Sequence, residues 1–141
     1  MNDAVRSDSS PVLAVDAGQS STRVRCEPGP WGPGWIVTSS GVRTALPLAQ
    51  QFATIMHDVA TAHPEITRSD CTVAIGSSGA RDDEDPIPVL HALKPFGVSR
   101  VLLAHDSITS YLGALGDQLG VVTASGTGVI TLAVGRHNVA R

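Results

Sequence analysis

The stretch from Val12 to Arg25 reads VLAVDAGQSSTRVR, and it decides how the rest of the sequence is interpreted. It opens with a short apolar run that ends at Asp16, and a second β-forming run follows a few residues later. Between the two runs stand small and polar residues: Gly18, Gln19, Ser20, Ser21 and Thr22. The pattern predicts a β-hairpin whose turn carries the chemistry.

The turn has the composition of an anion-binding loop. Small residues allow backbone N–H groups to approach an anion closely, and hydroxyl groups add further donors. A single carboxylate beside them, Asp16, suits a hydrated divalent cation. We interpret the hairpin as a loop for the phosphates of a nucleotide. An ordinary hairpin turn of Asp, Gly and Ser is the alternative, and other stretches must decide between the two.

Composition limits the classes of function. The chain has 141 residues, the size of one domain, with 16% charged residues and a net charge of -3. This charge excludes the basic surface that binding to nucleic acid or to an acidic membrane requires. Cys26 and Cys71 are far apart and lack metal-ligand spacing, which indicates a reducing compartment. Residues 1–10 are a polar leader without features of a signal peptide, so we expect a cytoplasmic protein.

The order of predicted elements indicates an α/β fold. Apolar periodicity and turn residues predict strands at 12–17, 22–26, 35–38, 72–75 and 101–104. Helices are predicted at 47–62, 87–93 and 107–115, the last with Ser107 as its N-cap. The order βββαβαβα implies a mixed five-stranded sheet with helices on its faces. The unbroken apolar run of the first strand predicts a central strand buried on both faces.

Three polar motifs follow the ends of predicted parallel strands. Asp16 ends the first strand, residues 77–79 follow the fourth, and Asp106 follows the fifth. Because ligands bind at the carboxyl ends of strands in such sheets, we expect these motifs to meet at one edge. For Asp106 the alternative is a simple helix start.

A second hairpin of similar character follows. Residues 120–135 read GVVTASGTGVITLAVG, which is two β runs around a Ser-Gly-Thr-Gly turn at 125–128. Two such turns about a hundred residues apart are expected of a two-lobed phosphate clamp. A plain tight turn is the alternative here.

Four motifs in this order carry a resemblance to a known family. They are VDAGQSSTR at 15–23, IGSSGA at 75–80, HDS at 105–107 and ASGTG at 124–128. Together they resemble the BadF/BadG/BcrA/BcrD-type ATPase family, which includes N-acetylglucosamine kinase and belongs to the sugar-kinase, heat-shock-protein and actin superfamily. The resemblance implies a ribonuclease-H-like lobe at 11–118, and the first hairpin of an incomplete second lobe at 119–141.

The resemblance also implies roles for residues. ATP and Mg²⁺ are the implied cofactors, and Asp16 would hold the waters of the metal ion. Asp106 would be the catalytic base for the acceptor hydroxyl of a sugar such as N-acetylglucosamine or glucosamine, with Ser78 and Gly79 beside it. The phosphates would be bound by both turns: Gly18, Gln19, Ser20, Ser21 and Thr22, with Ser125, Gly126, Thr127 and Gly128.

Two departures from the family pattern leave alternatives open. An Asn is expected in a Gly-x-x-x-Asn pattern after the third strand, but Gly41 is followed by Ala45 at that place, so the acceptor is undetermined. Most of the second lobe is expected after residue 141, and we therefore expect negligible kinase turnover from these residues alone. Other functions are an ATPase that activates a dehydratase, and a non-catalytic lobe that pairs with a second copy or a complementary second-lobe chain.

Overall fold

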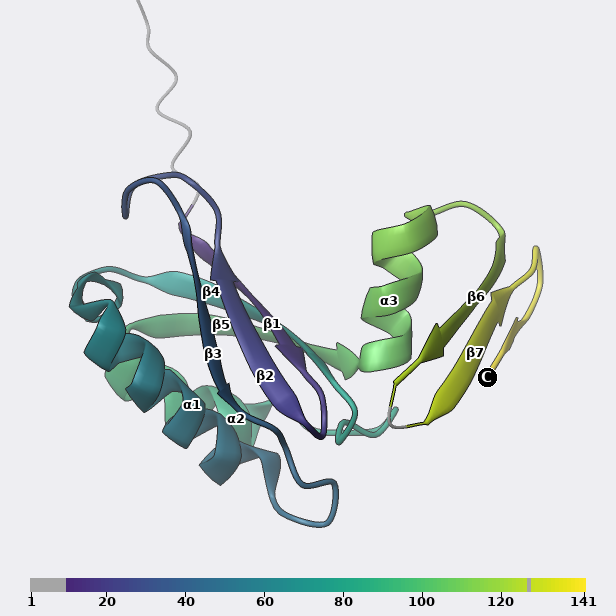
Figure 1. Cartoon of the computed structure of the whole chain (residues 1–141), viewed down its shortest axis with the longest axis horizontal. Coiled ribbons are helices and arrows are strands. Elements are labelled where there is room, and N and C mark those ends of the chain that lie inside the picture. Colours follow the sequence, from purple (N-terminus) through teal and green to yellow (C-terminus); the bar gives the residue numbers. More distant parts are fainter. Residues whose placement is uncertain (1–9, 127) are drawn as a thin grey trace, which may run out of the picture.

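The computed structural model describes residues 10–126 and 128–141, which form two β-sheets and three α-helices (Figure 1). The strands are β1 (Val12–Ala17), β2 (Ser21–Cys26), β3 (Trp35–Ser40), β4 (Cys71–Ser77), β5 (Val98–His105), β6 (Gly120–Ser125), β7 (Val129–Val134) and β8 (Val139–Ala140). The helices are α1 (Leu48–Ala62), α2 (Ile87–Leu93) and α3 (Asp106–Leu115), with short 3-10 helices η1 (Pro64–Arg68) and η2 (Lys94–Phe96). No helix in the described ranges is long and apolar enough to cross a membrane.

The large sheet confirms the predicted mixed topology. Its strand order is β3-β2-β1-β4-β5, with β1 antiparallel to β2 and parallel to β4, and β4 parallel to β5. The parallel strands β1, β4 and β5 therefore end at the same edge. The central place of β1 and the α/β class agree with the sequence, and β5 is longer than its apolar run predicted.

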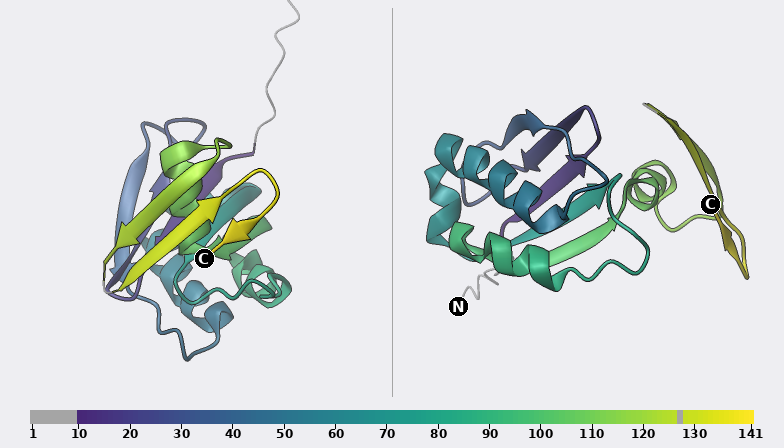
Figure 2. Two further views of the ribbon diagram at one scale, coloured as in Figure 1. Left: turned by 90° about the vertical axis from the view of Figure 1, so that its right-hand side faces the viewer. Right: turned by 90° about the horizontal axis from the view of Figure 1, so that it is seen from below.

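The prediction that β1 is buried on both faces is wrong. Leu13, Val15 and Ala17 are buried, whereas the alternate residues of this strand are exposed. The reason is that α1 and α2 pack together over one face of the sheet, with Phe52 and Ile55 of α1 in the same core (Figure 2). The other face is covered only in part, by α3, so apolar residues on that side of β1 remain accessible.

Helix α3 crosses the sheet at a position that requires glycine. Gly76 of β4 pairs with Asp16 of β1 and Ala104 of β5, and a Cβ atom built there would overlap the Thr109 side chain of α3. A residue without a side chain therefore allows the helix to lie close to β4. Beyond α3 lies the second sheet, so the helix separates the two sheets in the views along and across the molecule (Figures 1 and 2).

The second sheet contains the predicted hairpin and one additional strand. Its order is β6-β7-β8, and all its neighbours are antiparallel. Helix α3 contacts β6 and β7, and the Tyr111 hydroxyl of α3 donates a hydrogen bond to the Gln118 carbonyl just before β6. Strand β8 has two residues, too few to give a periodic signal in the sequence.

Both cysteines are buried in the core, and one histidine packs beside it. Cys26 and Cys71 are free and buried on β2 and β4. Burial, followed by the charge of Asp70, raises the pKa of Cys71 to about 11, and burial also raises the pKa of Cys26. His63 is half-buried, and its ring stacks on Trp35 at 4.0 Å between centroids.

Replacing Gly76 by Ala should destabilise the protein by about 1–3 kcal/mol, because the new methyl group displaces α3. Urea unfolding measures this, and the double variant Gly76→Ala/Thr109→Ala should recover part of the loss. Gly113→Ala is the matched control, since a Cβ on this α3 glycine meets none of the described residues within 4 Å and should stabilise the helix. Equal effects of the two glycine variants would contradict the close approach.

The free energy of unfolding should fall as the pH rises from about 9 to about 11. The folded state keeps the proton of Cys71 up to about pH 11, while the unfolded thiol loses it near its usual 9.0, so the folded state binds more protons in this window. Urea unfolding at several pH values measures the slope. The variant Cys71→Ala should show a smaller slope, and an unchanged slope would refute this assignment.

Candidate functional site

The motifs from the two ends of the chain line one cleft of about 720 Å³. It lies at the carboxyl edge of β1, β4 and β5, next to the turn between β6 and β7. Ten of the residues predicted from the sequence line it: Asp16, Gly18, Gln19, Ser20, Ser21, Ser78, Asp106, Ser125, Gly126 and Gly128. The expected meeting of both carboxylates and both turns in one place is therefore present in the structure.

The first turn is held from two sides. Its own closing bond runs from the Gly18 N–H to the Ser21 carbonyl at 3.1 Å, and the Val42 N–H donates to the Gly18 carbonyl at 2.9 Å. A Cβ on Gly41 would overlap the backbone of Gln19, so the loop after β3 lies directly against the turn. These contacts fix the backbone path of the turn before any ligand binds.

The second turn is supported mainly by its hairpin. Ser125 pairs with Val129 at the ends of β6 and β7, and the Gly126 N–H donates to the Gly128 carbonyl at 2.8 Å. Cβ atoms on either glycine would meet none of the described residues within 4 Å, and both glycines line the cleft. Thr127, which the sequence assigned to the phosphates, lies outside the described residues.

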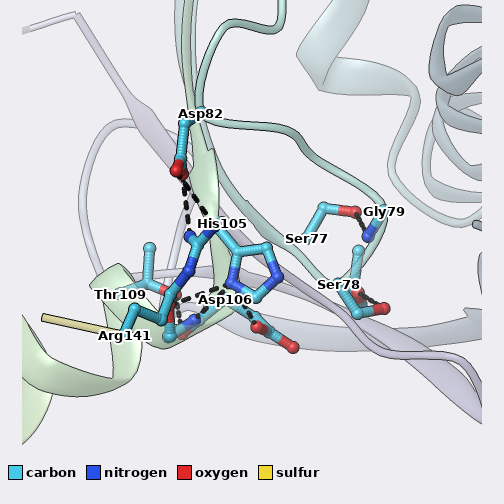
Figure 3. Close-up of polar contacts among 10 residues, drawn as sticks. Ser77, Ser78, Gly79, Asp82, His105, Asp106, Thr109 and Arg141 are labelled. Atoms are coloured by element: carbon cyan, nitrogen blue, oxygen red, sulfur yellow. Dashed lines mark hydrogen bonds and ion pairs between the residues drawn. The ribbon is translucent and has the colours of Figure 1, made fainter. Parts of the chain in front are cut away.

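The loop after β4 joins the strand ends together. Ser78 donates to the Ala17 carbonyl through its N–H at 3.1 Å and through its Oγ at 3.3 Å. Ser77 is fully buried, and its Oγ accepts the Gly79 N–H at 3.2 Å (Figure 3). Ser78 thus lines the cleft, whereas Gly79 is not part of its lining and lies against Leu48 of α1.

Asp106 is the first residue of α3 and projects at the cleft beside His105 (Figure 3). Its Oδ1 is buried and receives no hydrogen bond of acceptable geometry from the described residues, although it lies 2.9 Å from His105 Nδ1. Ser107 is not the N-cap that the sequence predicted. The cap is His105, two residues earlier, whose Nδ1 accepts the Ser107 N–H at 3.2 Å, so the helix begins at Asp106.

Thr22 is not brought into the cleft. The alternation along β2 turns Ser21 and Arg23 outward, and it turns Thr22 toward the core, where its side chain is fully buried. Its Oγ1 has no hydrogen-bond partner among the described residues. Because this hydroxyl is buried on the core side of β2, it is not placed to contact phosphates in the cleft.

Three residues at the site were not identified from the sequence. Arg23 lines the cleft directly opposite Asp16 in the β1–β2 register, and strand alternation could have indicated it. Gly41 supports the first turn through a tertiary contact, and His105 caps α3; neither has a local sequence signal. Ala45, at the place of the expected Asn, is exposed and does not line the cleft.

Solved structures show the same fold. A structure from Chromobacterium violaceum, provisionally named an N-acetylglucosamine kinase, matches with a TM-score of 0.67 and 23% identity over 91% of this chain and 46% of that one. A protein from Porphyromonas gingivalis with the same provisional name gives 0.67 and 16% over 92% and 46%. The inorganic polyphosphate/ATP-glucomannokinase of Arthrobacter sp. strain KM gives 0.52 and 17% over 89% and 58%.

These likenesses show that the five-stranded sheet and its helices share the fold of part of these solved structures. The chain spans about half the length of the structures it matches. No protein-family model and no curated protein sequence matches it.

Replacing Gly41 by Ala should distort the first turn, because the methyl group meets the rigid backbone of Gln19. We expect a loss of about 1–3 kcal/mol in unfolding free energy and changed amide resonances at residues 18–21. Urea unfolding and a backbone NMR spectrum measure both.

Gly29→Ala is the matched control for Gly41→Ala. A Cβ on Gly29 comes no closer than 3.9 Å to its nearest neighbour, so this variant should leave the turn resonances unchanged. Unchanged resonances in both variants would show that Gly41 does not support the turn.

Proposed function

We propose that this chain is the amino-terminal lobe of an ATP-dependent kinase of the BadF/BadG/BcrA/BcrD type, which transfers phosphate to a hydroxyl of an amino sugar such as N-acetylglucosamine or glucosamine. One observation carries the proposal: two glycine-containing turns and two carboxylates, about a hundred residues apart in sequence, line the same cleft. Structural turns and a simple helix start, the alternatives at each motif, give no reason for all of them to meet. The fold shared with sugar kinases adds independent support.

The backbone at both turns suits phosphate groups. Small residues at Gly18, Gly126 and Gly128 allow a ligand to approach both turns closely, and Ser20, Ser21 and Ser125 add hydroxyl donors. Arg23 adds a positive charge on the same wall. We infer that the terminal phosphates of ATP lie between the two turns.

Asp16 fits a magnesium ion that keeps most of its waters. Its carboxylate is exposed at the cleft, and oxygen is the ligand that Mg²⁺ prefers. The described residues contain no group of three or more His, Cys, Asp or Glu side chains that would form a complete protein cage. Asp16 would then bind waters of the ion, whose charge would offset that of the phosphates.

Asp106 is placed to act as the general base. It lines the same cleft as the phosphate turns, and 31% of its side-chain surface is exposed, so its carboxylate can accept the proton of a bound hydroxyl. Such a base contributes roughly 10²–10⁴-fold to rate. Orientation of the acceptor and stabilisation of the transferring phosphoryl group would supply most of the remainder.

The dehydratase-activating alternative is not favoured by the cysteines. An iron-sulfur cluster held between subunits needs cysteines at the surface, but Cys26 and Cys71 are buried. A partner chain remains part of the proposal. Val121, Val129 and Val139 are exposed on the second sheet, which suits contact with further residues of a second lobe or with another copy.

The proposal predicts that substitution of the two carboxylates has different consequences. Asp16→Asn should weaken binding of Mg·ATP roughly ten- to a hundredfold, because the metal-bound waters lose an acceptor. Asp106→Asn should leave that affinity within about twofold, and should reduce sugar phosphorylation by roughly 10²–10⁴-fold wherever the wild-type protein shows turnover. Calorimetry with ATP in the presence of magnesium or EDTA, and a coupled ADP assay with each amino sugar, measure both.

Asp70→Asn is the control for both variants, because Asp70 is exposed before the opposite, amino-terminal end of β4. It should bind Mg·ATP as the wild type does. Absence of any magnesium-dependent ATP binding by the wild-type chain would refute the nucleotide site. Binding without phosphorylation of any sugar by the assembled protein would refute the acceptor class.

A further inference from the structure

The side chain of Gln51 is bonded to the backbone of the loop between β3 and α1. Its Oε1 accepts the Arg43 N–H at 2.7 Å, and its Nε2 donates to the Arg43 carbonyl at 3.1 Å. The same Nε2 lies 3.0 Å from the Leu46 carbonyl and 3.3 Å from the Pro47 carbonyl. One half-buried side chain therefore contacts the backbone of three residues in this loop.

A primary amide is suited to this contact. The backbone of Arg43 offers one donor and one acceptor, and the Gln51 amide matches both because it also carries a donor and an acceptor. The Leu46 N–H donates to the Arg43 carbonyl at 3.1 Å, so residues 43–46 form a hydrogen-bonded turn. Gln51, the fourth residue of α1, binds this turn to the start of the helix.

The turn at 43–46 is joined to the first glycine-containing turn of the candidate site. Val42, which directly precedes Arg43, is buried, and its N–H donates to the Gly18 carbonyl at 2.9 Å. Gly41 lies against the backbone of Gln19. Because Val42 and Arg43 are consecutive, a displacement of Arg43 also displaces the N–H group that fixes Gly18.

The same segment also reaches the loop after β4. A Cβ built on Gly79 would lie 3.0 Å from the Leu48 side chain and 3.7 Å from the Thr44 Cα atom. Its neighbour Ser78 lines the cleft, as Gly18 does. The segment that Gln51 binds thus packs against two loops of the candidate site.

We propose that Gln51 is a positioning residue for the nucleotide site: its amide fixes the turn at 43–46 and, through Val42, keeps the first glycine-containing turn in the conformation that binds phosphates. Gln51 is not among the described residues that line the cleft, so it acts through the backbone alone. When the first turn samples other conformations, the binding-competent fraction falls and the apparent Kd rises in proportion. The effect on the nucleotide rests on the proposed function, whereas the effect on the turn does not.

The variant Gln51→Glu removes the donor and keeps the size of the side chain. At neutral pH its carboxylate can accept the Arg43 N–H, but it has no hydrogen to donate to the three carbonyl groups. A negative charge in the first turn of α1 interacts favourably with the helix dipole, so the helix itself should not be weakened. Gln50→Glu is the matched control, because it adds the same charge one residue earlier at an exposed position.

Amide hydrogen exchange and NMR measure the effect on the turn. In Gln51→Glu the Val42 amide should exchange about tenfold faster than in the wild type, and the resonances of residues 18–21 should move. The slowest amides of β4, which open only on global unfolding, should change less than Val42. Gln50→Glu should leave the Val42 exchange rate and the resonances of 18–21 as in the wild type.

Two results would overturn the positioning role. One is an unchanged exchange rate at Val42 in Gln51→Glu, and the other is an equal change at Val42 and in β4, which would show a general loss of stability. Gln51→Met, which fills the same space without a polar group, repeats the comparison should Gln51→Glu not fold.

Calorimetry with Mg·ATP measures the effect on the nucleotide site. The apparent Kd should rise roughly three- to tenfold in Gln51→Glu and stay within about twofold in Gln50→Glu. Where the assembled protein phosphorylates a sugar, the KM for ATP should rise by the same factor and kcat should stay within about twofold, since Asp106 is unaltered.

The binding results separate this inference from the proposed function. Faster exchange at Val42 with an unchanged Kd overturns the link between Gln51 and the nucleotide, while the nucleotide site stands. Absence of Mg·ATP binding by the wild-type chain overturns the nucleotide site and the role of Gln51 in it. The exchange rates then decide the contact between Gln51 and the turn by themselves.

Discussion

The close contact between α3 and β4 at Gly76 is the constraint on which the site depends. Without a side chain at this position, Thr109 lies against the strand, and α3 starts directly at the end of β5. That start carries Asp106, and the far side of the helix contacts β6 and β7. One missing Cβ thus determines the position of a carboxylate and of the second glycine-containing turn together.

The two turns that face each other across the cleft have different support. The first belongs to a five-stranded sheet, and it is fixed by Val42 and Gly41 from the following loop as well as by its own hydrogen bond. The second belongs to a three-stranded sheet that packs on α3 and is followed by Arg141, which pairs with Asp82 in the loop after β4. The geometry of the cleft therefore depends more on helix packing than on the sheet that carries Asp16.

The sequence predicts those features that follow from periodicity and from the ends of strands. The helices at 48–62 and 87–93 have strong apolar periodicity or clear boundaries, and Asp16 and Asp106 follow from the rule that ligands bind at carboxyl ends. Thr22 was assigned to the ligand because composition marks a turn without showing which way each side chain points. The exposed face of β1, the support by Gly41 and the cap by His105 depend on tertiary contacts, and no local pattern reports these.

Under the proposed function, Arg23 and a metal ion would together offset the negative charges in the cleft. Two carboxylates, Asp16 and Asp106, line a cleft in which Arg23 is the only lysine or arginine among the described lining residues. A triphosphate brings several negative charges, which would be repelled by both acids. The β1–β2 register sets Arg23 opposite Asp16, and a hydrated cation at Asp16 would add a second positive charge beside it. Under the proposed function, the same acids that would oppose a bare anion would favour the metal complex of the nucleotide, and Asp106 would be the base for the acceptor hydroxyl.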